Sequence, residues 1–270
     1  MNKVDTALEK QISPDSAPPP SLDTTAEIAW SWDVVHRPFK SCLFFARVRT
    51  ARRALKKLEA DLLRKQAAAI EGAKSNARYA ALLELGTSYR LMRSAISALT
   101  DERRRVSRLP RIVHKAGAEE PRMAAIANTY LNAVSGIFST DSFCHFLHAI
   151  QSREALNVDE LWCAGAFLKF ALLELLLENA NALLATEDTA PTSALLSQLH
   201  SLRLVTNIDW GFLVQPLITF DGILSQDPAA KYTQMDFESH QLYRRRVAFI
   251  ARFSDCTESR IAQLALELAR

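Results

Sequence analysis

Apolar residues recur at intervals of three and four along most of the chain, which is the pattern of amphipathic helices. The first such stretch runs from about residue 44 to residue 70, and a second runs from about 76 to 105 after a break at Gly72. The apolar face of the first stretch is formed by Leu55, Leu58, Leu62 and Leu63. We expect these two long helices to pair as an antiparallel hairpin.

Helix-start and helix-stop residues divide the second half of the chain. Pro121 suits the first turn of a helix and Gly136 ends that helix. Asn157 followed by Glu160 forms a capping box ahead of a helix that reaches about residue 185. Further helix starts are predicted at Asp209, Asp227-Pro228, Asp236 and Thr257.

These patterns predict an all-α fold. It is a multi-helix bundle in which a long N-terminal helical hairpin precedes a compact array of shorter helices. The helix that starts at Asp209 is expected to continue to residue 224 with a kink at Pro216. No strand is predicted anywhere in the chain.

The stretch 161–184 is apolar enough to require a membrane test. A spanning helix needs about 20 mostly apolar residues. Lys169, Glu174 and Glu178 interrupt this stretch, and a charge near the bilayer centre costs roughly 2.5–3.5 kcal/mol. We therefore predict a buried core helix.

Composition supports helices and suggests a division into three parts. The 270 residues are 49% hydrophobic and include only 7 glycines, which favours helices over hairpin-rich β structure. Residues 1–27 are rich in proline and small polar residues and are expected to form a disordered tail. Residues 28–108 are expected to form the basic helical hairpin, and residues 109–270 a second helical region.

Positive charge is concentrated in two places, although the net charge is only +3. One cluster contains Arg47, Arg49, Arg52, Arg53, Lys56 and Lys57, and the other contains Arg103, Arg104, Arg105, Arg108 and Arg111. The first cluster is a solvated helix face, which is the interpretation we favour, an attachment site for an anionic membrane, or a nucleic-acid-binding face. In the membrane hypothesis, nearby aromatic residues lie at the interface: Trp30, Trp32, Phe44 and Phe45. The modest net charge predicts no nucleic-acid partner.

No motif predicts catalytic, cofactor-binding or metal-binding residues. Glycine-rich phosphate loops, nucleophile elbows and zinc-protease motifs are absent from the sequence. His145 and His148 share a helix face beside Cys144, but a structural zinc site needs four ligands. Glu174 and Glu178 lie one turn apart on one helix, whereas a glycosidase needs two carboxylates across a cleft. The four cysteines lack CxxC spacing and indicate free thiols in a reducing compartment.

Three stretches of the second half carry a family resemblance. They are Leu109-Pro110-Arg111-Ile112 with Pro121-Arg122-Met123; Glu160-Leu161-Trp162 with the run 168–174; and Leu202-Arg203-Leu204 through Asp209-Trp210, Asp227-Pro228-Ala229, Tyr232, Met235-Asp236-Phe237 and Tyr243-Arg244. From about residue 108 onward the chain resembles the N-terminal helical region of cyclic β-1,2-glucan synthases. The family-like structural positions are Glu160, Trp162, Lys169, Glu174, Asp209, Trp210, Asp227, Asp236, Tyr243 and Arg244.

The resemblance implies part of a large bacterial membrane enzyme that builds β-1,2-glucan from UDP-glucose. The matched region precedes the membrane helices of that family and is not where glucose transfer is expected, so whether this chain is an enzyme stays open. His145 stands where the family usually has an arginine, and Ala248 stands where the family commonly has an acidic residue. The family's transferase and phosphorylase-like domains have no counterpart in these residues, which suggests a fragment, a split subunit or a decayed relative.

We therefore expect a non-catalytic scaffold or regulatory region without a cofactor. Its expected partners are the remaining domains or subunits of a glucan synthase and an anionic membrane surface. Its expected location is the cytoplasm, at the inner face of the bacterial inner membrane. The alternatives are a free-standing adaptor that binds a protein or membrane through the basic hairpin, and a small sugar-binding module that uses Trp162 or Trp210.

Overall fold

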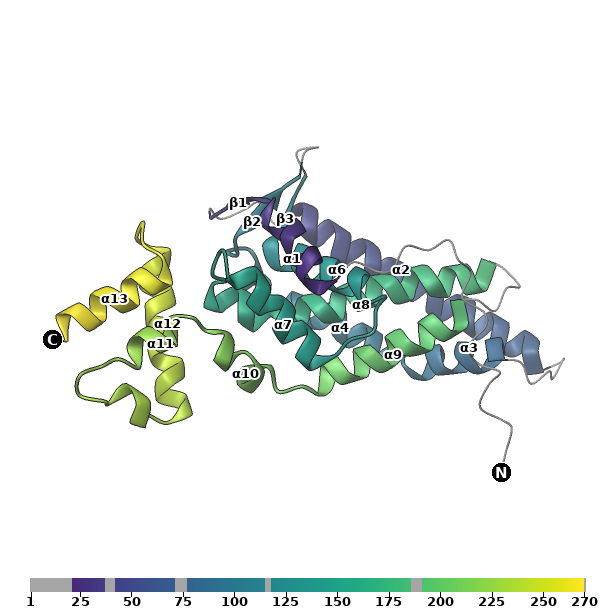
Figure 1. Ribbon diagram of the computed structural model, residues 1–270. Helices are drawn as coiled ribbons and strands as arrows, with labels where there is room; N and C mark the ends of the chain where they lie inside the picture. Colours follow the sequence, from purple (N-terminus) through teal and green to yellow (C-terminus); the bar gives the residue numbers. More distant parts are fainter. Residues whose placement is uncertain (1–20, 37–41, 71–76, 115–117, 186–190, 270) are drawn as a thin grey trace, which may run out of the picture.

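The computed structural model describes residues 21–36, 42–70, 77–114, 118–185 and 191–269. Helices make up most of these residues, and the all-α fold class is confirmed (Figure 1). The predicted helix break at Gly72 lies outside the described residues.

Helix α8 (Val158–Ala185) is the centre of the fold. It packs against α2 (Cys42–Ile70), α4 (Tyr89–Asp101), α6 (Arg122–Ala133) and α9 (Pro191–Asn207). Neighbours on several sides explain its nearly continuous apolar sequence, so the predicted buried core helix is confirmed. Among the described helices, none has both the length and the apolar composition needed to cross a bilayer.

A small antiparallel sheet joins the two halves of the chain. Its strands are β1 (Asp33–Val35), β2 (Arg111–Val113) and β3 (Glu119–Pro121), in the order β1-β2-β3. The prediction of no strand was wrong here, because three-residue strands are too short to carry a period-two pattern. Strand β1 pairs with β2, and α2 and α4 pack on α8. Residues before and after the predicted boundary at 108/109 therefore share one hydrophobic core.

A helix occupies part of the predicted tail. Helix α1 (Leu22–Trp30) begins after Ser21, whose hydroxyl accepts a hydrogen bond from the backbone N–H of Thr24 at 3.2 Å. Thr25 and Ala26 are buried, and α1 packs on α6 and α7 (Thr140–Gln151). The disorder prediction was therefore wrong for residues 22–27, because small side chains allow a polar segment to pack closely. Residues 1–20 of the predicted tail lie outside the described residues.

The second helix of the predicted hairpin is divided into three. These are α3 (Ala77–Thr87), α4 and α5 (Arg103–Val106), with interruptions at Ser88 and Glu102. Both α3 and α4 pack on α2, while α4 also reaches α8. The hairpin is therefore one layer of the central bundle.

Most of the predicted helix starts in the second half are confirmed. The side chains of Asp209, Asp236 and Thr257 accept hydrogen bonds from backbone N–H groups three residues later, at 3.2, 2.7 and 3.2 Å. Glu160 Oε2 accepts a hydrogen bond from the N–H of Asn157 at 2.9 Å, as the capping box requires.

Two predicted helices of the second half differ from the structure. The helix expected over 209–224 is instead α10 (Trp210–Leu213), the 3-10 turn η1 (Gln215–Leu217) and α11 (Asp221–Leu224). Pro216 lies in η1, where a missing N–H is tolerated while a continuous α-helix is not. Asp227 accepts backbone hydrogen bonds, but only the 3-10 turn η2 (Tyr232–Gln234) follows it.

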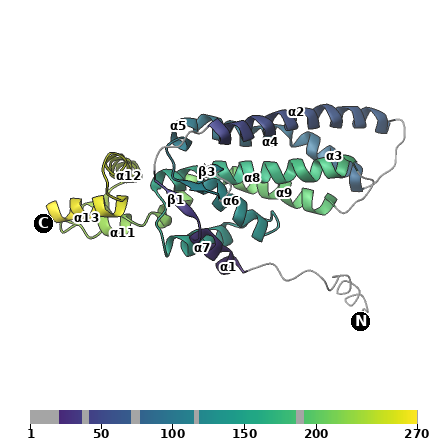
Figure 2. The same ribbon diagram turned by 90° about the horizontal axis from the view of Figure 1, so that it is seen from above.

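Three helices form a C-terminal unit, residues 221–268. Helix α13 (Glu258–Leu268) packs on both α11 and α12 (Phe237–Arg252), and the unit lies at one end of the bundle (Figures 1 and 2). It meets the bundle at the start of α8. There Arg252 pairs with Asp159 at 2.6 Å, and Glu258 accepts a hydrogen bond from the N–H of Val158 at 3.0 Å.

Candidate functional site

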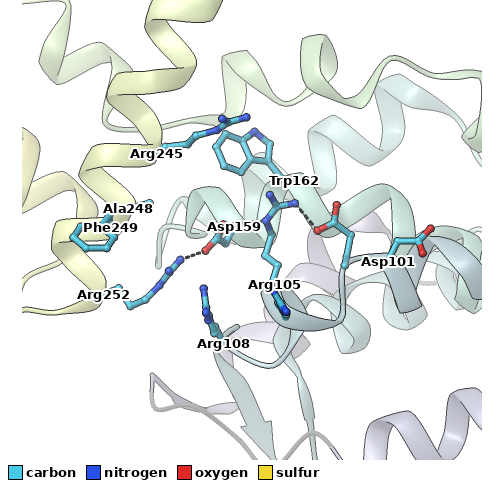
Figure 3. A pocket seen from close by; sticks show the side chains of 11 residues that line it. Asp101, Arg105, Arg108, Asp159, Trp162, Arg245, Ala248, Phe249 and Arg252 are labelled. Atoms are coloured by element: carbon cyan, nitrogen blue, oxygen red, sulfur yellow. Dashed lines mark hydrogen bonds and ion pairs between the residues drawn. The ribbon is translucent and has the colours of Figure 1, made fainter.

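A cleft of about 330 Å³ lies between the bundle and the C-terminal unit (Figure 3). Its walls come from the end of α4, from α5, from the first turns of α8 and from α12. We call it the arginine cleft. It is lined by Asp101, Glu102, Arg104, Arg105, Arg108, Asp159, Trp162, Arg245, Ala248, Phe249 and Arg252.

Local structure explains why these side chains meet. Val106 and Leu109 are buried at 0% and 1% exposure, which fixes α5 on the bundle, while Arg104 and Arg108 face solvent. On α12 the lining residues are spaced by three and four positions, so they share one helical face: Arg245, Ala248, Phe249 and Arg252.

Asp159 organises one side of the cleft. Its carboxylate pairs with Arg105 at 3.2 Å and with Arg252 at 2.6 Å, which links the bundle to the C-terminal unit. Arg105 also pairs with Glu102 at 2.6 Å, and its guanidinium carbon lies 5.4 Å from the centroid of the Trp162 ring. This cation–π contact holds Arg105 against the wall of the cleft.

The remaining arginines of the cleft are not neutralised in this way. Five arginines face three carboxylates, so the cleft has two positive charges in excess. The side chains of Arg104, Arg108 and Arg245 form no ion pair or hydrogen bond within the described part of the chain, and all three residues are exposed. The arrangement favours a multiply charged anion.

Glu258, the first residue of α13, contacts the start of α8. Burial, followed by the negative charges of Asp159 and Glu160, raises the pKa of Glu258 to about 8. Its hydrogen bond from the N–H of Val158 opposes this rise. The contact between the bundle and the C-terminal unit therefore contains a carboxyl group that titrates near neutral pH.

Arg122 and Glu160 form a buried ion pair in the bundle. Arg122 is 3% exposed and Glu160 is fully buried. The Arg122 guanidinium donates to Glu160 Oε1 at 2.9 Å and to Oε2 at 2.6 Å, and also to Glu154 at 2.5 Å. Burial alone lowers the pKa of Arg122, but the charge and hydrogen bonds of Glu160, then those of Glu154, outweigh burial and raise it. The family-like position Glu160 thus joins α6 to α8.

Two further family-like positions lie along α8. Glu174 accepts two hydrogen bonds from Arg47, at 2.6 and 2.5 Å, and the same arginine pairs with Glu120 at 3.1 Å. Lys169 is half-buried, burial lowers its pKa, and its side chain has no hydrogen bond or ion pair with the described residues.

Trp210 packs inward. Its indole N–H donates to the carbonyl of Val205 at 2.9 Å, and its ring lies against Gly165 and 6.2 Å from the ring of Phe143. A ring held in this way has little surface left for stacking on a sugar.

The last family-like positions stabilise the C-terminal unit. Arg244 is 3% exposed and donates to Asp221 of α11, with a distance of 2.9 Å from Nε to Oδ2. The Tyr232 hydroxyl donates to the same carboxylate at 2.8 Å, and the exposed ring of Tyr243 lies 6.0 Å from the Tyr232 ring. Asp227 and Asp236 accept the backbone hydrogen bonds described above.

The weaker sequence candidates do not form a chemical site. His145 pairs with Asp23 at 2.9 Å, and no group of three or more metal-ligating residues occurs in the described chain. Glu174 and Glu178 line the same wall of a second, polar hollow with Arg47, so they do not face each other across a cleft.

The basic face of α2 is exposed, but two of the four aromatic residues that the membrane hypothesis invoked are buried. Arg49, Arg52, Arg53, Lys56 and Lys57 are exposed. Phe44 and Phe45 are buried at 3% and 4% exposure, so the expectation that they lie at a membrane interface was wrong. They pack beside α8, where Phe44 contacts its aromatic rings.

Sequence reasoning missed the arginine cleft. The runs of arginines at 103–111 and 244–246 were visible in the sequence, but Arg245 and Arg252 join Arg104, Arg105 and Arg108 only through the tertiary fold.

No protein-family model matches the chain, and no curated protein matches it.

Proposed function

We propose that this chain is a non-catalytic helical scaffold, and that it belongs to a cyclic β-1,2-glucan-synthase-like protein at the inner face of the bacterial inner membrane. The observation that carries the proposal is that the family-like residues make contacts within the fold. All of them except Lys169 cap helices, form ion pairs or pack rings inside the described structure. Residues that bind a sugar nucleotide would instead converge on a cleft, and among these positions only Trp162 lines the arginine cleft.

An exposed stripe on α12 supports a scaffold that contacts other domains or subunits. Leu242, Phe249 and Phe253 are 67%, 48% and 73% exposed, and their spacing places them along one side of the helix. Arg246 lies between them, with its guanidinium carbon 5.5 Å from the centroid of the Phe249 ring. Contiguous exposed apolar side chains on one helix commonly mark a protein contact.

The test is an association experiment with an activity control. The purified chain is mixed with detergent-solubilised cyclic β-1,2-glucan synthase from which the corresponding N-terminal region has been removed. We expect co-purification with the wild-type chain and loss of co-purification with Leu242→Ser/Phe253→Ser. The matched control, Leu43→Ser/Leu63→Ser, changes exposed leucines on α2 and should co-purify normally.

Two results would contradict the proposal. A wild-type chain that does not co-purify would sink the assignment to a glucan synthase. Release of UDP from UDP-glucose by the purified chain alone would sink its non-catalytic role.

The exposed basic row on α2 favours a second candidate, an adaptor that binds a protein partner or an anionic membrane. Five basic side chains face solvent there, and electrostatic attraction contributes about 1 kcal/mol for each basic residue near an anionic bilayer. Sedimentation with vesicles of 30% anionic lipid would distinguish this candidate. Arg52→Gln/Arg53→Gln should weaken vesicle binding if α2 is the contact, and leave it unchanged if α2 is only a solvated face.

A further inference from the structure

We infer that the arginine cleft binds a compact polyphosphate anion, a di- or triphosphate group, and that this anion bridges the bundle to the C-terminal unit. The inference goes beyond the proposed scaffold role and does not depend on the family resemblance. It rests on the cleft, on its charge balance and on the origin of its arginines in two parts of the fold.

Charge defines the kind of ligand. The cleft has two positive charges in excess, and Asp159 already neutralises much of the charge of Arg105 and Arg252. The arginines without a partner in the described structure are Arg104, Arg108 and Arg245. Their guanidinium groups present planar sets of N–H donors, which match phosphate oxygens well.

Size limits the ligand further. A volume of about 330 Å³ is at the lower end of the range for small-molecule sites, about 300–1,000 Å³. The cleft is thus too small for a folded macromolecular segment. A single phosphate offers few oxygens, whereas a di- or triphosphate offers enough oxygens to accept hydrogen bonds from several guanidinium groups at once.

Trp162 forms part of the wall of the cleft. It lines the cleft together with Arg105 and Arg245 (Figure 3), and the Arg105 guanidinium lies over its ring. Held against the ring, Arg105 loses less side-chain freedom when an anion binds. Trp162 is therefore a positioning residue, and its indole is a built-in reporter of occupancy.

The walls belong to different parts of the fold. Arg104 and Arg108 lie on or beside α5 of the bundle, and Arg245 lies on α12 of the C-terminal unit. An anion that contacts both sides adds a link to the existing contacts of Asp159 and Glu258. Bound ligand is thus expected to hold the C-terminal unit more firmly against the bundle.

Isothermal titration calorimetry of the full chain with inorganic triphosphate tests the site. We expect saturable binding with one site, together with a change in tryptophan fluorescence that Trp162→Phe removes. Arg104→Gln/Arg108→Gln should raise the dissociation constant by about tenfold or more, because it removes charge-assisted hydrogen bonds. Arg245→Gln, which changes the opposite wall, should also raise the dissociation constant.

Controls separate a built site from general charge attraction. Arg52→Gln/Arg53→Gln removes the same charge from the exposed face of α2 and should leave the dissociation constant within about twofold. None of the substituted arginines has a partner in the described structure, so circular dichroism should show unchanged folding. Equal weakening by the two double variants would overturn the inference, as would the absence of binding at millimolar triphosphate.

Two sources of the same chemistry can be distinguished in parallel titrations. Tighter binding of a nucleoside triphosphate than of inorganic triphosphate would identify a nucleotide as the ligand. Equal affinities would identify the phosphate chain itself. Both results support a polyphosphate site. An affinity for inorganic monophosphate equal to that for triphosphate would contradict it.

Discussion

Removal of one partner of the buried Arg122–Glu160 pair should be strongly destabilising. In Glu160→Gln the shape of the side chain is retained, but the charge opposite Arg122 is lost. The guanidinium is 3% exposed and cannot reach water without rearrangement. Glu154 remains as its charged neighbour, and the Ala155 carbonyl accepts a hydrogen bond at 3.3 Å.

The expected cost follows from this environment. Loss of one partner of a buried ion pair costs about 3–5 kcal/mol, because the other charge stays buried without compensation. Glu154 is 45% exposed and compensates only in part, so we expect a loss of about 3 kcal/mol. Domains of this size are stable by roughly 5–15 kcal/mol, so the loss is a large fraction of the total.

Urea unfolding followed by circular dichroism measures the effect. The double variant Arg122→Met/Glu160→Leu should recover most of the lost stability, because a buried pair and an apolar replacement are often similar in energy. Glu174→Gln is the matched control: its partner Arg47 is 39% exposed, and the expected cost is below about 1 kcal/mol. Equal losses in Glu160→Gln and Glu174→Gln would refute the reasoning.

Three further predictions follow from other parts of the fold. Gly165→Ala places a Cβ atom 2.5 Å from the indole of Trp210 and should lower the free energy of unfolding, measured in urea, by about 1–3 kcal/mol. The control Gly222→Ala has open space around the new Cβ atom and should be neutral or stabilising. Because Glu258 has a pKa of about 8 in the folded state and 4.5 ordinarily, the folded state retains a proton that the unfolded state releases between these values. Wild-type stability should therefore fall as pH rises from about 5 to 8, by at most about 1.4 kcal/mol per pH unit, and Glu258→Gln should lack this part of the pH dependence; parallel profiles would contradict the assignment. Burial raises the pKa of Cys163 to about 12, so peptide mapping after alkylation at pH 8 should show Cys163 modified far more slowly than Cys256, and equal rates would indicate an accessible thiol.

Helix ends in the second half were predictable because they depend on local chemistry. Asp209, Asp236 and Thr257 each bind an N–H three residues away, so a few positions of sequence contain the whole interaction. The long apolar run of α8 likewise indicated a helix covered on several sides.

Features that depend on distant parts of the chain were not predictable. The strand at 33–35 exists through pairing with 111–113, nearly eighty positions away. The arginine cleft requires α12 to lie beside α5, and no local pattern specifies that placement. Arg122 follows Pro121 at a predicted helix start, and only the fold reveals its buried contact with Glu160.

The central claim is that the family-like residues stabilise a scaffold and take no part in glucose transfer. It is tested most directly by measuring the folding stability and the glucan synthesis of the same variants. A cyclic β-1,2-glucan synthase without its N-terminal helical region is supplied with the purified chain in bacterial membranes, and glucan formation from UDP-glucose is measured. We predict that the wild-type chain restores synthesis, that Lys169→Gln restores it equally, and that Glu160→Gln fails only at temperatures where it unfolds. Failure of the wild-type chain, or loss of synthesis in a fully folded Glu160→Gln variant, would contradict the account.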